Sequence, residues 1–224
     1  FKESIQAEYS DLRTKYLSRS ASKKLLSLGE ARANHFTIDS ALKAESPKVL
    51  GRQPALEFDL AELSAYIDWT PFFQTWQLHG KYPRILEDEV VGTEAKKLFA
   101  DAQQMLNQII DEKWLQARGV FGIWPAQRSG ADDISIIENG EERAKFFTLR
   151  QQTQKAAAAP NLALADFIAE EEDYVGCFAV CAGLGIETKV REFEAAHDDY
   201  SSILLKALAD RLAEAAAEYL HERI

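Results

Sequence analysis

The hydrophobic period changes twice along this chain of 224 residues, and no other feature restricts the fold as much. From Thr93, a suitable N-cap, apolar residues recur every three or four positions as far as Ile110, which predicts an amphipathic helix. Short segments rich in β-branched and aromatic residues follow, and helical spacing returns from about Glu187 to the end. A helix, a group of strands and a second long helix together indicate an α+β protein.

Strands are expected in four segments, which cover residues 118–126, 132–138, 144–152 and 173–183. Asn139-Gly140 lies between the second and third segments and is a strong signal for a hairpin turn. We therefore predict an α+β fold in which a small, twisted, largely antiparallel sheet is flanked by helices, with a long C-terminal helix. No repeat or low-complexity linker divides the sequence, so residues 1–224 are expected to form a single domain.

The part of the chain before the first strand also has helical signals. Apolar positions are three or four apart in the first seventeen residues, and Ser27 followed by Glu30 fits a capping box at the start of another helix. Residues 37–53 have no firm period and are predicted to be an extended connector. Gly80 and Pro83 predict irregular backbone before the helix at Thr93.

Charge and hydrophobicity exclude two classes of partner. The formal net charge is −10, whereas binding to a nucleic-acid backbone requires clustered Lys and Arg. No apolar run approaches the roughly 20 residues that span a bilayer, and the first residues have no apolar signal-peptide segment. We therefore expect a cytoplasmic protein that binds neither nucleic acid nor membrane and whose charge suits a cationic ligand or a basic protein patch.

The two cysteines, Cys177 and Cys181, lie in the last predicted strand. Four residues of strand separate them by roughly 13 Å, which is too far for a disulfide. No other thiol and no neighbouring His could complete a zinc site. We predict two buried free thiols in a reducing compartment.

Two acidic groups could hold a cation and a third could face a ligand or partner, and each also has a purely structural interpretation. Residues 87–89 fit a solvated loop before a helix N-terminus, and residues 197–199 fit a surface helix on which consecutive side chains diverge. The third group consists of Asp210, Glu214, Glu218 and His221. It fits an exposed helix face, or a face that accepts a partner or ligand beside small alanines. No metal site is predicted.

Asp68 stands in the densest aromatic stretch of the chain, DWTPFFQTW, which covers residues 68–76. Aromatic residues at this density normally enter a core, where an unpaired carboxylate is unfavourable. Because Asp68 precedes Thr-Pro, its side chain can cap a turn, and on local grounds this interpretation is favoured. The alternative is a binding role for the carboxylate.

Long segments of the sequence resemble one protein family. The segment YIDWTPFFQTWQLHGKYPRILEDEVVGTEAKKLF, which begins at Tyr66, closely resembles the activation, or reactivation, domain of cobalamin-dependent methionine synthase. Further segments resemble the same family in the family's order and extend the likeness over nearly the whole chain. They are RGVFGIWPA, DDISI, LRQQT, LADFIA, DYVGCFAV and HDDYSSILLKALADRLAEAAAEYLHER.

The resemblance implies a C-shaped α+β module that repairs an oxidised enzyme. Such a domain binds S-adenosylmethionine over the cobalamin-binding domain of the same enzyme. An electron from flavodoxin or a related flavoprotein then permits reductive methylation of cob(II)alamin, which regenerates methylcobalamin. Carried over residue by residue, the resemblance implies that Asp68 and Glu214 bind S-adenosylmethionine and that Asp210 faces the cobalamin domain. The ammonium and sulfonium of this ligand suit a carboxylate in an aromatic setting.

The sequence departs from the family pattern in one respect. Nothing in it matches the family's Arg-x-x-x-Gly-Tyr-Pro segment, which supplies much of the S-adenosylmethionine site. We therefore expect an activation domain that is incomplete at its C-terminus and inactive by itself, as part of a 5-methyltetrahydrofolate–homocysteine methyltransferase whose cobalamin is carried by another domain. The alternative is a non-catalytic docking module for the cobalamin domain and the flavoprotein that does not bind S-adenosylmethionine.

Overall fold

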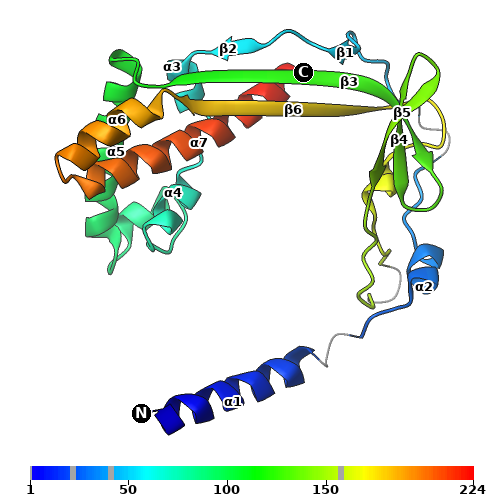
Figure 1. The fold of residues 1–224 in the computed structure, drawn as a ribbon, viewed down its shortest axis with the longest axis horizontal. Helices are drawn as coiled ribbons and strands as arrows, with labels where there is room; N and C mark the ends of the chain where they lie inside the picture. Colours follow the sequence, from blue (N-terminus) through cyan, green and yellow to red (C-terminus); the bar gives the residue numbers. More distant parts are fainter. Residues whose placement is uncertain (1, 21–23, 40–42, 156–158) are drawn as a thin grey trace. The chain divides into compact units, whose positions relative to one another are not determined.

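The computed structural model describes residues 2–20, 24–39, 43–155 and 159–224, and Figure 1 shows the fold. The helices are α1 (Lys2–Ser20), α2 (Leu28–Ala33), α3 (Leu60–Ser64), α4 (Trp69–Thr75), α5 (Gly92–Asp111), α6 (Ile186–Ala195) and α7 (Asp199–Arg223), with short 3-10 helices η1 (Arg84–Glu87) and η2 (Leu164–Phe167). The strands are β1 (Gly51–Arg52), β2 (Leu56–Phe58), β3 (Gln116–Ser129), β4 (Asp133–Glu138), β5 (Glu141–Phe147) and β6 (Asp173–Leu184).

The strands form a six-stranded sheet around β3. Strands β1, β2, β4 and β6 all pair with β3, and β5 pairs with β4. The β2–β3, β3–β4 and β4–β5 pairs are antiparallel. Asn139 and Gly140 join β4 to β5 with φ values of 54° and 81°, the left-handed region that this dipeptide favours. The predicted α+β fold, its largely antiparallel sheet and its hairpin are therefore confirmed.

The chain divides into two compact units, and each has its own core. The first unit consists of Phe1–Gly51 and Ile123–Gly176, and the second of Arg52–Gly122 and Cys177–Ile224. Strands β3 and β6 contribute residues to both units. The expectation that residues 1–224 form a single domain stays a prediction.

The second unit has a large hydrophobic core between its helices and its part of the sheet. Figure 1 shows α5, α6 and α7 gathered beside β3 and β6. Leu208 of α7 is fully buried in this core, and Ala117 on β3 and Ala182 on β6 form the sheet side of it. At Gly119 on β3, an added Cβ would lie only 2.6 Å from the Phe58 ring, so the close approach of this ring requires glycine.

The first unit has a smaller hydrophobic core and a buried ionic network. Its core residues are Ala126, Ile134, Ile136 and Ala165. The Arg150 side chain, only 1% exposed, bonds Asp166 through both terminal nitrogens at 2.6 and 2.8 Å and Asp132 through Nε at 2.7 Å. Burial alone would raise the pKa of each aspartate, but their bonds with Arg150 hold both pKa values below the usual range.

The N-terminal helices agree with the sequence. The capping box of α2 is present, because Glu30 N–H donates to Ser27 Oγ at 3.2 Å and Ser27 N–H donates to Glu30 Oε2 at 2.8 Å. On α1 the apolar stripe is not covered, since Tyr9 and Tyr16 are 64% and 72% exposed. The described residues of the connector 37–53 contain no helix, and residues 40–42 of it lie outside the described part.

The C-terminal helical pattern is divided into α6 and α7, which corrects the expectation of an unbroken run from Glu187. His197 has a φ of 55°, which breaks the helix, and Asp198 then caps α7 by accepting the Ser201 N–H at 2.9 Å. Residues 197–199 are therefore a turn and a helix start, not part of one helix face.

Two other boundaries differ from the sequence expectation. Helix α5 begins at Gly92, ahead of the predicted cap Thr93, because Asp88 already accepts the N–H groups of Val90 and Val91 at 2.9 and 3.0 Å. Strand β5 ends at Phe147 and not near residue 152, because the chain turns Arg150 into the buried network.

Cys177 and Cys181 are free, as predicted, but they are exposed and not buried. Both lie on β6, and alternation along the strand places them on the face opposite Ala182, which enters the core. Because helices cover only the Ala182 face, the prediction that both thiols are buried was wrong.

Candidate functional site

Asp68 is the N-cap of α4, and its side chain is exposed. Its Oδ1 accepts the backbone N–H of Thr70 at 2.9 Å, which satisfies one of the free donors at the helix start. No second hydrogen bond to Asp68 occurs within the described residues, so Oδ2 is available to a ligand. The capping interpretation is therefore confirmed, and it occupies only one of the two carboxylate oxygens.

The aromatic residues that follow Asp68 belong to the core. Trp69 is 8% exposed, and Phe72 and Phe73 are completely buried. The rings of Trp69 and Phe73 contact Phe99 on α5, with centroids 4.9 and 6.2 Å apart. These contacts fix α4 against α5 and so fix the position of Asp68. Buried rings cannot present their faces to a ligand, so these three side chains do not form an aromatic setting for a cation at Asp68.

Asp210 and Glu214 lie on α7 and share one counterion. The Asp210 side chain is 70% exposed and the Glu214 side chain 47% exposed. Arg211 Nη2 donates to Asp210 Oδ2 at 2.6 Å, and Arg211 Nη1 donates to Glu214 Oε2. Sequence reasoning placed the two acids on one face but missed Arg211, although its spacing of three residues from Glu214 indicates an ion pair on a helix.

The rest of the acidic group on α7 does not join these three residues. His221 packs edge-on against Phe178 of β6, with ring centroids 4.8 Å apart, and its Nδ1 lies 2.8 Å from the Ala217 carbonyl oxygen. Glu218 is exposed, and no hydrogen bond or ion pair to it occurs in the described part of the chain. Of the polar stripe predicted from spacing, Asp210 and Glu214 are therefore joined through Arg211, whereas the other two residues stand apart from them.

Asp68, Asp210 and Glu214 all belong to the second unit, on helices that pack against each other through one core. Among the residues that the structure describes, no hydrogen bond joins Asp68 to either acid of α7. The shared core fixes both helices, so a ligand that reaches both sites meets carboxylates on a rigid support.

A groove of about 450 Å³ lies elsewhere in the second unit. Trp76 and Tyr200 form part of its wall, with ring centroids 5.3 Å apart. The Tyr200 hydroxyl donates to Asp101 Oδ2 at 2.7 Å. Burial, together with this bond, raises the pKa of Tyr200 to about 12. None of the three residues implicated by sequence lines this groove.

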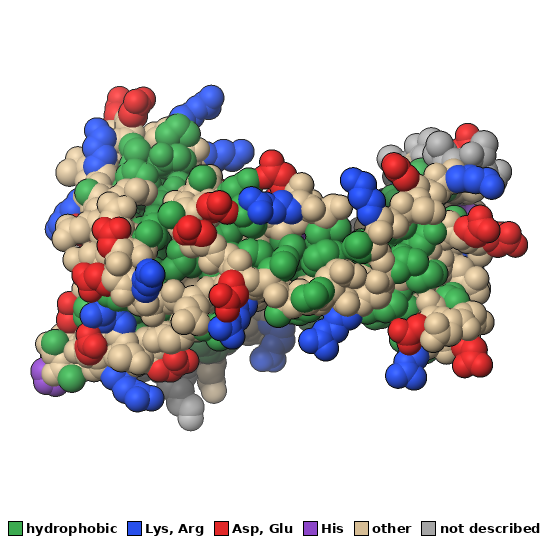
Figure 2. Space-filling view, turned by 90° about the horizontal axis from the view of Figure 1, so that it is seen from above, with side chains coloured by type: hydrophobic (Ala, Val, Ile, Leu, Met, Phe, Trp, Pro, Cys, Tyr) green, Lys and Arg blue, Asp and Glu red, His purple; other side chains and the backbone are tan. Residues whose placement is uncertain are grey.

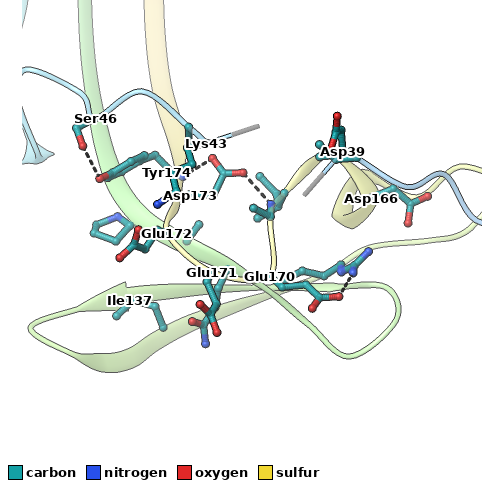
Figure 3. A pocket seen from close by; sticks show the side chains of 18 of the residues that line it. Asp39, Lys43, Ser46, Ile137, Asp166, Glu170, Glu171, Glu172, Asp173 and Tyr174 are labelled. Carbon is teal, nitrogen blue, oxygen red and sulfur yellow. Dashed lines mark hydrogen bonds and ion pairs between the residues drawn. The ribbon is translucent and has the colours of Figure 1, made fainter. Parts of the chain in front are cut away.

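A cavity of about 900 Å³ lies in the first unit and is acidic (Figure 3). Glu170, which pairs with Arg128, and Glu171 lie along it, and the Tyr174 hydroxyl is 3.1 Å from Ser46 Oγ. Size alone would suit a small ligand. However, Asp68, Asp210 and Glu214 lie outside this cavity, and the cavity holds no arrangement that indicates a particular ligand.

Charge and composition of the described residues limit the chemistry further. On the face shown in Figure 2, basic and acidic side chains are interspersed, so the net charge of −10 does not form one acidic patch there. No group of three His, Cys, Asp or Glu residues in the described part could hold a metal ion. No described helix has both the length and the apolar character needed to cross a membrane.

Comparisons with known proteins identify the family. The protein-family model described as "Vitamin B12 dependent methionine synthase, activation domain" matches residues 59–224. The chain is also similar to a solved structure, the MetH reactivation domain bound to AdoHcy, with 50% sequence identity and a TM-score of 0.82. The match covers 89% of this chain and 63% of that chain, so this chain spans less than two thirds of the length of its relative. This chain therefore belongs to the family of activation domains of vitamin B12-dependent methionine synthase.

Proposed function

We propose that this chain binds S-adenosylmethionine through Asp68 and Glu214 and presents Asp210 to the cobalamin-binding domain of the same enzyme. In this role, in the cytoplasm, it supports reductive methylation of cob(II)alamin with an electron from flavodoxin or a related flavoprotein. Cobalamin, carried by another domain, supplies the metal that accepts the methyl group. The side chains of this chain take no covalent part, and they bind and orient the methyl donor.

The proposal rests on one observation, the pair of available carboxylates on helices that share a core. Asp68 keeps one oxygen free after capping α4, and Glu214 is half-exposed on α7. A carboxylate that accepts from an ammonium forms a charge-assisted bond, worth about 1.5–3 kcal/mol. The related structure is described as bound to AdoHcy, the molecule that remains when S-adenosylmethionine loses its methyl group, and this supports the ligand class.

The charge change of the ligand also fits the acidic character of the site. S-adenosylmethionine carries a sulfonium and an ammonium, and transfer of the methyl group converts the sulfonium into a neutral thioether. Carboxylates near the ligand therefore stabilise the methyl donor more than the product that remains. The family's remaining segment, which this sequence does not match, is expected to add the contact to the ligand's carboxylate.

Isothermal titration of S-adenosylmethionine into this chain tests the proposal. Asp68→Asn keeps the N-cap, because Asn and Asp cap equally well, but removes the charge. We expect the variant to bind about tenfold more weakly or worse, as loss of a charged hydrogen bond predicts. Asp59→Asn is the matched control, since Asp59 caps α3 in the same unit by accepting the Ala61 N–H at 2.8 Å. This control is expected to bind like the unsubstituted chain.

Two results would contradict the proposal. Equal affinity in the Asp68→Asn and Asp59→Asn variants would remove Asp68 from the site. No binding to the unsubstituted, folded chain, together with no binding after the family's Arg-x-x-x-Gly-Tyr-Pro segment is joined to it, would favour the docking module, which engages the cobalamin domain and the flavoprotein without S-adenosylmethionine.

A further inference from the structure

Arg211 is placed unlike the two acids that it bonds. Its side chain is only 14% exposed, whereas those of Asp210 and Glu214 are 70% and 47% exposed. Each acid receives one of the two terminal nitrogens of the guanidinium. A cation that is mostly removed from water depends on its counterions, and here both counterions are the acids assigned to binding and docking.

We infer that Arg211 is a positioning residue that couples the S-adenosylmethionine site at Glu214 to the docking site at Asp210. The inference rests on the proposed function and adds a residue to it. The planar fork of arginine allows one side chain to hold two carboxylates in fixed positions, which the single nitrogen of lysine cannot do in the same way. Like charges on one helix face, which would otherwise repel, are thereby held together.

The sign of the coupling follows from the charges. A cationic ligand at Glu214 competes with Arg211 for that carboxylate, and Arg211 then relies on Asp210. A cationic group of the docking domain that binds Asp210 displaces Arg211 from that carboxylate, and Arg211 then relies on Glu214. When both sites are filled, two acids face three cations, so each binding event weakens the other. By linkage the effect is the same in both directions.

The consequence for the enzyme is that docking changes the affinity for the methyl donor. Before docking, Arg211 bonds both Asp210 and Glu214. The ammonium of the methyl donor then competes with Arg211 for Glu214 only. Engagement of Asp210 by another domain strengthens the Arg211–Glu214 contact and weakens the hold on the ligand's cationic groups. Docking thus weakens binding of the methyl donor, which carries a sulfonium and an ammonium, more than binding of the demethylated product, which keeps only the ammonium.

The Asp210→Asn substitution removes one counterion of Arg211, as docking would. A double-mutant cycle of Asp210 and Arg211 therefore measures the coupling. S-adenosylmethionine is titrated into the unsubstituted chain and into the Asp210→Asn, Arg211→Lys and Asp210→Asn/Arg211→Lys variants. We expect Asp210→Asn to weaken binding about fivefold or more, because Arg211 turns fully to Glu214. In the Arg211→Lys background the same change is expected to alter binding by less than about twofold, since an exposed charge at Asp210 acts only weakly by itself.

Glu218→Gln is the matched control, because Glu218 is an exposed acid one turn beyond Glu214 that does not contact Arg211. It should leave binding unchanged in both backgrounds. An equal effect of Asp210→Asn in both backgrounds, or no effect in either, would overturn the coupling. Glu214→Gln separates the two proposals: unchanged binding in this variant refutes the assignment of Glu214 to the ligand, whatever Arg211 does.

A measurement without ligand tests the bridge itself. Nuclear magnetic resonance of the Arg211 guanidinium should show slow rotation about Nε–Cζ in the unsubstituted chain. The slow rotation should persist in Asp210→Asn and in Glu214→Gln, because one acid still binds the guanidinium in each. It should disappear in the Asp210→Asn/Glu214→Gln double variant. Fast rotation in the unsubstituted chain would overturn the inference even if S-adenosylmethionine did not bind.

Discussion

Replacing Arg150 by leucine should strongly destabilise the first unit. All five N–H donors of Arg150 are used: besides Asp132 and Asp166, they reach the carbonyl oxygens of Asn161 at 2.6 Å and Ala131 at 2.9 Å. The Arg150 side chain therefore connects the turn before β4, the η2 segment and the loop that precedes η2. Leucine has a similar apolar stem but can make none of these bonds.

The magnitude follows from what remains buried. The side chains of Asp132 and Asp166 are 8% and 0% exposed, so the variant leaves two carboxylates without their shared cation. Loss of one partner of a buried ion pair costs about 3–5 kcal/mol. Asp132 keeps Arg32, whose Nη2 lies 2.6 Å from Oδ2, so most of the loss falls on Asp166. We expect the free energy of unfolding of the first unit to fall by about 4 kcal/mol.

Hydrogen exchange followed by mass spectrometry measures this change in each unit separately. Where opening is a rapid equilibrium that precedes exchange, about 4 kcal/mol corresponds to roughly 1,000-fold faster exchange, up to the rate of unprotected amides. We expect this acceleration in β4 and η2 and unchanged protection in α7. Arg143→Leu is the control in the same unit, because its pair with Glu138 is 3.7 Å long and exposed, and it should cost less than about 1 kcal/mol.

The reasoning fails if β4 keeps its protection within about tenfold in the Arg150→Leu variant, or if α7 loses as much protection as β4. Acid titration gives a further check on the sign. The folded-state pKa values of Asp132 and Asp166 are lowered, so their contribution is present above about pH 4 and is lost as pH falls through the folded-state values. The difference between the two proteins should therefore shrink below about pH 4.

Three further predictions concern the second unit. Asp68→Ala should lower its free energy of unfolding by about 1 kcal/mol in thermal denaturation, whereas Asp68→Asn should not, because only alanine removes the N-cap. Spectrophotometric titration should give Tyr200 a pKa of about 12, and Asp101→Asn should lower this pKa. Because the folded-state pKa is raised, any contribution of Tyr200 to stability should be present below about pH 10 and be lost between about pH 10 and 12. Gly119→Val should cost about 1–3 kcal/mol by overpacking. Gly183→Ala in the same unit, whose added carbon would lie 3.8 Å from Ala209 Cβ, should not destabilise the protein in chemical denaturation.

The helix and strand order could be predicted because one face of each long element enters a core. The apolar stripe of α5 and the Asn139-Gly140 turn are local signals, and both were sufficient. The break between α6 and α7 was not visible in the stripe, because Phe193 and Tyr200 are seven residues apart and stay in phase across it. Residues 196–198, with left-handed backbone at His197, separate the two helices.

Long-range pairing explains the predictions that failed. The pattern of β6 shows alternating faces but not which face a helix covers, so Cys177 and Cys181 were placed inside. Arg150 follows an apolar run and was predicted to continue a strand. Its partners Asp132 and Asp166 lie 18 and 16 residues away, and no short-range pattern connects charges at that separation.

The two interpretations of Asp68 do not exclude each other, and the geometry shows why. Capping α4 needs one acceptor oxygen, and Oδ1 alone accepts the Thr70 N–H. Binding an ammonium needs a charge and a second oxygen, which capping leaves unused. The local rule that favours Asp at an N-cap is satisfied equally by Asn, so capping explains a polar residue at this position but not the negative charge. The N-terminus of a helix also favours a negative charge, so α4 itself accounts for part of the preference for Asp. A variant that keeps the cap while losing the charge measures what the charge contributes to α4 and to the binding of a cationic ligand.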